Sequence, residues 1–217
     1  LPLFQPEIDI WNEYGILKSF LGRFKKASPK EVLSNSVELR DLVKAMKESV
    51  KPEIFNNSSF ETRVNIMYNE SLRLADMNTI PAITAKEVNT QIRYNLFFIE
   101  SEILEGLGYT DKALKVLQDA LSERSDISEL WYCIGVLQYK MGDFILAKSS
   151  FENAIERMQD MAKYHRVLAE TLYKLKEYEE AVDYAITSIE LVHNVAAAHY
   201  ILAQSLEKLG DFDNAKT

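Results

Sequence analysis

A pattern of large and small side chains recurs every 34 residues in the second half of the chain. In the unit that starts at Ser128, large apolar residues stand at the fourth, seventh, seventeenth and twenty-fourth positions, and small residues at the eighth, twentieth and twenty-seventh. The pattern starts again at Ala162 and at Ala196 without insertion. A fixed period of this length is typical of repeat architectures built from one supersecondary unit. In the first unit the large residues are Trp131, Ile134, Phe144 and Phe151, and the small ones are Gly135, Ala147 and Ala154.

The order of these side chains predicts a pair of packed helices in each unit. Small residues let two helix backbones approach closely, and the large ones fill the space between them. Gly142 supplies the left-handed backbone that ends the first helix, and Asp143 is expected to cap the second. One pair cannot bury both of its faces, so consecutive pairs stack and the first helices line a concave surface.

These residues resemble the tetratricopeptide repeat family, whose unit is two antiparallel helices in 34 residues. The resemblance implies an all-α fold, a right-handed α-α superhelix of helical hairpins. The residues before it are expected to form an N-terminal helical hairpin or small bundle. Histidine replaces the family's tryptophan at His165 and His199, and no unit has the family's proline near position thirty-two. The implied repeats are about 94–127, 128–161, 162–195 and a truncated 196–217, and the first of them fits the pattern least well.

The first part of the chain shows no such recurrence, and its punctuation predicts helices over about 7–26, 29–49, 59–77 and 84–106. Three cap signals, each a hydroxyl residue followed three positions later by glutamate, are SPKE at Ser28, SSFE at Ser58 and TAKE at Thr84. We therefore expect residues 1–90 to form a helical segment packed on the first repeat of a domain at 91–217. Residues 69–89 are faintly similar to helical proteins of bacterial cell envelopes, which favours the envelope or periplasm over the cytoplasm.

Composition and charge exclude several classes of function. Only 7 Gly and 5 Pro are present, too few for a many-stranded β fold. No run of apolar residues is long enough to span a membrane. Residues 1–90 hold 12 basic and 12 acidic side chains, so the formal charge of −8 lies in residues 91–217, with 13 and 21. Such a surface repels phosphate backbones, which argues against nucleic acid and for a neutral to basic protein or peptide partner.

The chain carries no recognisable catalytic motif, and we expect neither an enzyme nor a cofactor. It has no glycine-rich phosphate loop, nucleophile elbow or zinc-protease helix motif. His165 and His199 occupy the same position in successive units, the one arrangement that could point to a metal, although replacement of a packing tryptophan is the simpler account. Cys133 is expected to be a buried, inert thiol.

Binding through the concave surface remains, and the resemblance implies which side chains face it. In the family, positions two, five, nine, twelve and thirteen of the first helix point into the groove. The chaperone-binding members hold a carboxylate there, but of the corresponding positions only Lys163 fits, so that use is rejected. The expected partner-binding residues are Phe98, Glu102, Tyr132, Val136, Tyr139, Lys163, Arg166, Glu170, Tyr173, Tyr200 and Gln204.

Two functions stay open on this evidence. The first is a non-catalytic scaffold that binds a peptide segment or partner protein in the tyrosine-rich groove, because tyrosine offers a large contact area at low entropic cost. The second is a structural or self-assembling module whose groove is filled by its own N-terminal helices or by a second copy, which leaves a homodimer open. In that case some of the tyrosines pack between helices.

Overall fold

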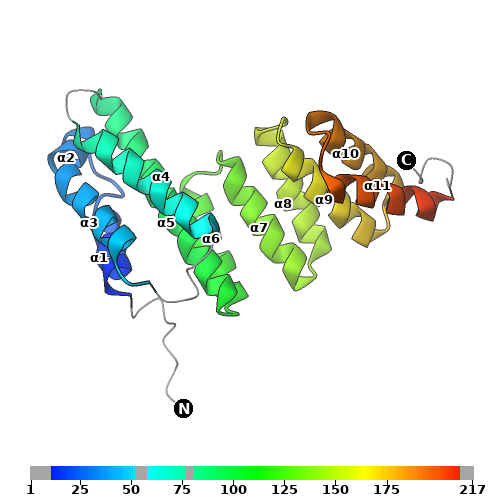
Figure 1. The fold of residues 1–217 in the computed structure, drawn as a ribbon, viewed down its shortest axis with the longest axis horizontal. Helices are drawn as coiled ribbons and strands as arrows, with labels where there is room; N and C mark the ends of the chain where they lie inside the picture. The colour runs from blue at the N-terminus through cyan, green and yellow to red at the C-terminus, as the bar shows by residue number, and fades with distance from the viewer. Residues whose placement is uncertain (1–10, 52–57, 77–80, 211–217) are drawn as a thin grey trace, which may run out of the picture. The chain divides into compact units, whose positions relative to one another are not determined.

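The computed structural model describes residues 11–51, 58–76 and 81–210. Within these residues the chain forms eleven helices and no strand, which confirms the predicted all-α class (Figure 1). The chain divides into two compact units, unit 1 from Leu1 to Val116 and unit 2 from Leu117 to Thr217. None of the described helices is both long and apolar enough to cross a bilayer. The division by repeats, at 90/91, stays a prediction.

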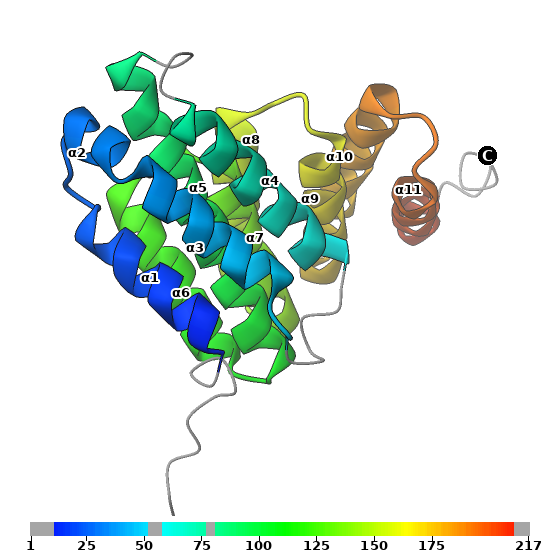
Figure 2. The same ribbon diagram turned by 60° about the vertical axis from the view of Figure 1, so that its left-hand side comes forward.

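Unit 1 is a helical bundle. In the order of the chain, α3 lies against α1, α4 against α3, and α5 against α4, as the adjacent ribbons in Figure 2 show. Apolar side chains such as Leu17, Val43, Val64 and Ile92 are fully buried and form its core. Its helices are α1 (Asn12–Arg23), α2 (Pro29–Ser34), α3 (Ser36–Glu48), α4 (Ser58–Ala75) and α5 (Ala82–Gly106).

The single helix predicted over 29–49 is wrong, because the chain breaks it at Asn35. The backbone of Asn35 has φ −112° and ψ 9°, which leaves the helical region. Its side-chain amide donates to the carbonyl of Glu31 at 2.8 Å, and the Ser36 hydroxyl donates to the carbonyl of Leu33 at 2.7 Å. Short polar side chains compete in this way for the carbonyls that helical N–H groups would use. Two helices, α2 and α3, result.

The three predicted helix-cap signals have different outcomes in the structure. At Ser28 the predicted capping box is confirmed, with the Ser28 N–H donating to the Glu31 carboxylate at 2.7 Å. At the second signal, Glu61 pairs with Lys51. The third is wrong, since α5 already begins at Ala82, after Pro81. Pro81 itself is the N-cap residue, with φ −58° and ψ 147°, and it makes no side-chain cap hydrogen bond.

Other predicted helix ends shift by a few residues. The helix predicted over 7–26 runs from Asn12 to Arg23, and its first predicted residues, 7–10, lie outside the described residues. The helix predicted over 59–77 runs from Ser58 to Ala75, and that over 84–106 ends at Gly106 as predicted.

Unit 2 consists of helical hairpins, and α6 (Thr110–Glu123) crosses the boundary between the two units. Only two residues join α7 to α8, and likewise α9 to α10, so helices that pack together after so short a turn run antiparallel (Figure 1). Helix α9 also contacts α8 and α11, which stacks one hairpin on the next. The helices are α7 (Ser128–Met141), α8 (Phe144–Arg157), α9 (Ala162–Leu175), α10 (Tyr178–Leu191) and α11 (Ala196–Leu209).

The turn between paired helices follows the predicted glycine and departs from the predicted cap. Gly142 has φ 86°, the left-handed conformation, and the N–H of Asp143 donates to the carbonyl of Gln138 at 2.9 Å. The prediction that Asp143 caps α8 is wrong, because its side chain makes no cap hydrogen bond. Instead the turn closes through its backbone, in the bonding pattern of a Schellman motif. The same left-handed position, 34 residues on, is held by Lys176 with φ 66°.

The small residues lie at the helix contacts that they were predicted to mark. A Cβ atom added to Gly135 would stand 2.6 Å from Cε1 of Phe151, so the ring of α8 rests directly on the α7 backbone. Ala147 and Ala154 are fully buried, as are Ala181 and Ala185 in the next hairpin. Close backbone approach and ring packing together build the core of unit 2.

Candidate functional site

Helices α7, α9 and α11 line an open cavity of about 450 Å³ in unit 2. Tyr139 comes from α7, Glu170 and Tyr173 from α9, and Tyr200 and Gln204 from α11. Five of the eleven predicted residues thus meet at one cavity, which we call the tyrosine pocket. Its full lining is Tyr139, Glu170, Tyr173, Lys174, Ala197, Tyr200, Ile201 and Gln204.

Some polar side chains of the tyrosine pocket form hydrogen bonds with neighbouring side chains of the same helix. Glu170 accepts a hydrogen bond from Arg166, one turn earlier on α9, at 2.5 Å through Oε1. The amide of Gln204 donates to the hydroxyl of Tyr200 at 2.9 Å. Burial, and secondarily the negative charge of Glu170, raises the pKa of Tyr139. The phenol of Tyr139 is therefore neutral at physiological pH and available as a hydrogen-bond donor.

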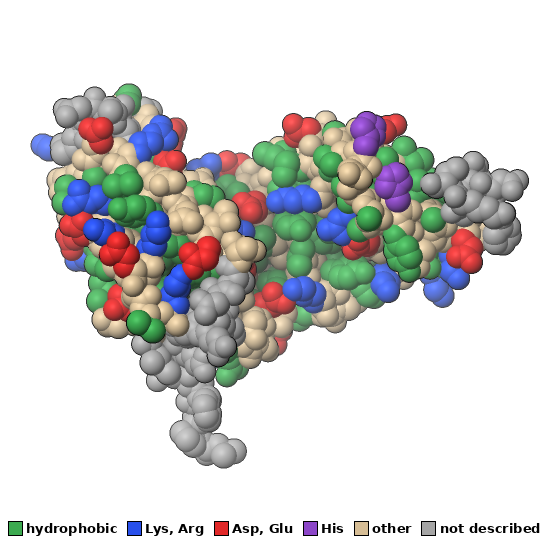
Figure 3. Space-filling model, in the orientation of Figure 1, with side chains coloured by type: hydrophobic (Ala, Val, Ile, Leu, Met, Phe, Trp, Pro, Cys, Tyr) green, Lys and Arg blue, Asp and Glu red, His purple; other side chains and the backbone are tan. Residues whose placement is uncertain are grey.

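Both signs of charge occur on the visible face of unit 2, where Lys and Arg side chains and Asp and Glu side chains are spaced among hydrophobic ones (Figure 3). Around the tyrosine pocket the only carboxylate of the lining is Glu170, and the only cation is Lys174, whose side chain is exposed. The pocket therefore combines aromatic faces with one acidic and one movable basic group.

Three other predicted residues are engaged in packing between α7 and α9. The ring of Tyr132 stacks on Tyr164 at 5.1 Å between centroids, and the ammonium of Lys163 lies 4.8 Å above the Tyr132 ring. Burial raises the pKa of Tyr132. Val136 packs against the buried cluster around Phe151 and Leu168. The alternative that some groove tyrosines pack between helices thus applies to Tyr132.

Phe98 and Glu102 lie in unit 1, where helix α4 covers them. Phe98 is 2% exposed, and the guanidinium carbon of Arg63 stands 4.3 Å from its ring centre. Arg63 donates to Glu102 at 3.1 Å, and the hydroxyl of Ser59 donates to the same carboxylate oxygen at 2.7 Å. Side chains of α4 therefore already contact Phe98 and Glu102, the two predicted binding residues of unit 1.

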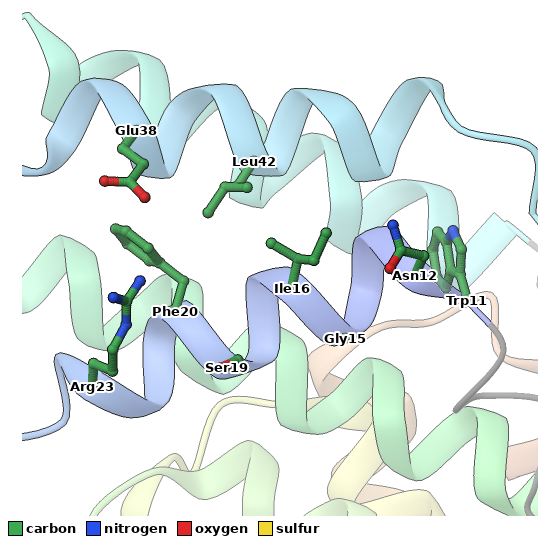
Figure 4. Close-up of a pocket in the computed structure, with 9 residues that line it drawn as sticks. All are labelled: Trp11, Asn12, Gly15, Ile16, Ser19, Phe20, Arg23, Glu38 and Leu42. Atoms are coloured by element: carbon green, nitrogen blue, oxygen red, sulfur yellow. The ribbon is translucent and has the colours of Figure 1, made fainter.

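Unit 1 contains a second cavity, of about 510 Å³, between α1 and α3. Figure 4 shows Ile16, Phe20 and Leu42 along its middle, with Arg23 and Glu38 at one end. The other end is lined by Trp11 and Asn12. No sequence pattern singled it out, since its apolar residues belong to ordinary helix faces.

His165 and His199, which stand at the repeat position of Trp131, make the same structural hydrogen bond as that tryptophan. Trp131 donates from its ring nitrogen to the carbonyl of Ser125, six residues earlier, at 2.9 Å. His165 repeats this contact with the carbonyl of Gln159 at 2.6 Å, and His199 with that of His193 at 3.0 Å. Histidine preserves the ring N–H donor that anchors the preceding loop. Across the described part of the chain, no three His, Cys, Asp or Glu side chains are grouped as metal ligands would be.

Three residues that line the tyrosine pocket, Lys174, Ala197 and Ile201, are not among the eleven predicted residues. Ala197 stands at position two of its repeat, one of the positions expected to face the groove, but a small alanine side chain does not by itself indicate a binding residue. Ile201 is 5% exposed and belongs to a buried cluster with Ala169 and Ala185. The repeat register could have identified Ala197, whereas the sequence pattern predicts that Ile201 is a core residue.

Comparison with known proteins agrees with this fold. The tetratricopeptide repeat family matches residues 132–188, and again residues 196–217. Mouse (Mus musculus) Superkiller complex protein 3 is 31% identical over 68 residues, which cover 29% of this chain and 4% of that protein's length. The chain thus spans a small fraction of that relative.

Solved structures of MamA share the fold. One MamA crystal structure has a TM-score of 0.55 at 14% identity and covers 74% of this chain and 89% of its own. MamA from Desulfovibrio magneticus RS-1 has a TM-score of 0.53 at 16% identity and covers 74% and 90%. At such identities the likeness concerns the fold alone.

The fold and the matched repeats together define an α-helical repeat protein of the interaction-scaffold type. The two matched segments, residues 132–188 and 196–217, are tetratricopeptide repeats.

Proposed function

We propose that the chain is a non-catalytic scaffold that binds a peptide segment or partner protein in the groove of unit 2. The observation that carries the proposal is the tyrosine pocket, in which residues from α7, α9 and α11 converge on one cavity. Such a surface suits an extended segment, because successive side chains meet successive first helices. The excess of carboxylates in residues 91–217 supports a neutral to basic partner.

In this proposal the side chains of the tyrosine pocket make two kinds of contact with a ligand, aromatic packing and hydrogen bonds. Tyr139, Tyr173 and Tyr200 supply aromatic contact area with few rotatable bonds to immobilise. Glu170 and Gln204 supply acceptors that orient a bound polar group. Tyr200 is 66% exposed, which leaves its ring open to a ligand.

A site-specific photo-crosslinker tests this function. A benzophenone amino acid replaces Tyr200, and the matched control carries it at Ile145 of α8, which is 76% exposed and does not line the pocket. In cells of the source organism, we expect mass spectrometry to identify the same protein segment crosslinked at Tyr200 and absent at Ile145. Equal crosslinking at both positions, or none at Tyr200, would count against groove binding.

The second candidate function is a structural module whose groove is filled from within or by another copy. The contact of α4 with Phe98 and Glu102 favours it, since the chain already covers two groove positions with its own side chains. Under this alternative the Tyr200 crosslinks join two copies of the same chain. Light scattering across a concentration series then shows a dimer, which a variant with Tyr200→Ala weakens.

A further inference from the structure

The contact in unit 1 shows what kind of side chain these repeat positions accept. Phe98 and Glu102 stand one helical turn apart on α5, at positions five and nine of the repeat that starts at Tyr94. Together they hold one arginine of α4, Arg63, whose guanidinium carbon lies 4.3 Å from the centre of the Phe98 ring while its Nε–H donates to the Glu102 carboxylate at 3.1 Å. An aromatic ring and an acceptor oxygen, one turn apart, therefore form an arginine seat.

The same two positions recur in the tyrosine pocket. Three repeats of 34 residues separate Phe98 from Tyr200 and Glu102 from Gln204. Helix α11 thus again offers an aromatic ring and an oxygen acceptor one turn apart, and both line the pocket. The two sites differ in solvent exposure, because the Phe98 side chain is 2% exposed and the Tyr200 side chain is 66% exposed.

The far wall of the pocket supplies the negative charge that Gln204 lacks. Glu170 uses Oε1 for Arg166, and its second oxygen, Oε2, is the acceptor that we assign to a ligand. Gln204 donates its amide N–H to Tyr200, which leaves its carbonyl oxygen as an acceptor. Tyr139 and Tyr173 add further ring faces.

These groups favour a guanidinium over other side chains. Aromatic faces carry negative potential and attract cations, arginine more often than lysine. A guanidinium is planar and weakly hydrated, and its several donors suit two separate oxygens. A ligand carboxylate would face Glu170 and the ring faces, and only the exposed Lys174 would favour it.

We infer that the tyrosine pocket binds an arginine side chain of the partner segment, seated on Tyr200 and bonded to Glu170 and Gln204. The inference rests on the groove function proposed above and names the residue that the groove selects. Arg166 competes for the same carboxylate, so its removal is expected to strengthen the interaction.

Three capped alanine-based peptides test this inference on the full 217-residue chain. They differ only in the central residue, which is arginine, its uncharged analogue citrulline, or glutamate. Binding is followed by nuclear magnetic resonance from the backbone amides of Ala197, Tyr200 and Ile201 on α11. We expect the arginine peptide to bind about tenfold more tightly than the citrulline peptide, since it alone adds the cation–π and ionic contributions.

Four variants locate the effect. Glu170→Gln should reduce the preference for arginine over citrulline towards unity, and Tyr200→Leu should weaken the arginine peptide about fivefold. Glu179→Gln, on α10, removes an exposed carboxylate that does not line the pocket and should change nothing. Arg166→Gln should tighten the arginine peptide. Thermal melting confirms that each variant is folded, and the high exposure of Tyr200 spares the core.

The outcomes separate this inference from the broader function. Equal binding of arginine and citrulline peptides, preference for glutamate, or weaker arginine binding in Arg166→Gln overturns the arginine seat while groove binding stands. If no peptide shifts the α11 amides although Tyr200 still crosslinks to a partner, the arginine seat also fails alone. Failure of both experiments removes the groove function as well.

Discussion

Replacement of Gly135 by alanine tests whether the helix contact in the first complete hairpin of unit 2 is as close as it must be. The added Cβ atom would stand 2.6 Å from Cε1, 2.8 Å from Cδ1 and 3.0 Å from Cζ of Phe151. Carbon atoms in ordinary contact are about 3.5–4.0 Å apart, so the ring would have to retreat by about 1 Å. Phe151 is buried, which leaves the ring no open space to enter.

The expected change in the free energy of unfolding combines two terms. Overpacking a core costs about 1–3 kcal/mol, whereas alanine in place of glycine inside a helix gains about 0.5–1 kcal/mol. The two ranges leave a net loss of about 0–2.5 kcal/mol, so Gly135→Ala should lower stability by about 1 kcal/mol, measured as a shift of the urea midpoint of unfolding. Gly15→Ala in α1 is the matched control, since its Cβ meets nothing within 4 Å and only the gain applies.

A second substitution makes the reasoning refutable. Phe151→Leu shortens the side chain that meets the new Cβ, so Gly135→Ala should cost less in that background than in the wild type. The next hairpin supports this compensation, because Ala169 and Ala185 are both alanines at the two corresponding positions. A gain in stability on Gly135→Ala, or an unchanged penalty beside Phe151→Leu, would refute the close contact.

Three further perturbations have definite expected outcomes. Lys176→Gly should raise the free energy of unfolding by about 1 kcal/mol in thermal denaturation, since a side chain at φ 66° costs about 1–2 kcal/mol and glycine's greater freedom when unfolded offsets part of that. Burial raises the pKa of Tyr132 and Tyr164 above the usual 10.0, so stability should be full below about pH 10 and fall as the pH rises further, in denaturant titrations at fixed pH values. Nitrogen-15 spectra should show the Nε2–H tautomer of His165, which donates to the Gln159 carbonyl, and a protonated Nδ1 at neutral pH would contradict that assignment.

The hairpins of unit 2 were predictable from sequence because their cause is local and repeated. Gly135 and Ala169 recur at one position, where any larger residue would separate the helices. Gly142 marks the turn, since a left-handed residue after a helix is usually glycine. The break at Asn35 was not predictable, because three consecutive polar residues are equally compatible with a continuous exposed helix until their hydrogen bonds are known.

The candidate site was predictable only as a set of positions. The resemblance to the repeat family implied which positions of each first helix face the groove, and five of the residues at these positions line the tyrosine pocket. What covers those positions depends on tertiary packing. The N-terminal segment was expected to pack on the first repeat, but it has no repeat register of its own, so its pattern could not identify α4 as the helix that lies on Phe98. For Tyr132 the neighbour is Tyr164, on the following first helix.

The contrast between Phe98 and Tyr200 explains how one repeat position serves two purposes. In the predicted repeat register both stand at position five, and each has an acceptor one turn later, Glu102 or Gln204. In unit 1 the arginine that this pair accepts is provided by α4, so the contact contributes to folding. In unit 2 the ring of Tyr200 is exposed, so the same chemistry is available to another molecule. In such a repeat, the chemistry of a position and the cover over it are separate properties, and binding requires the second as much as the first.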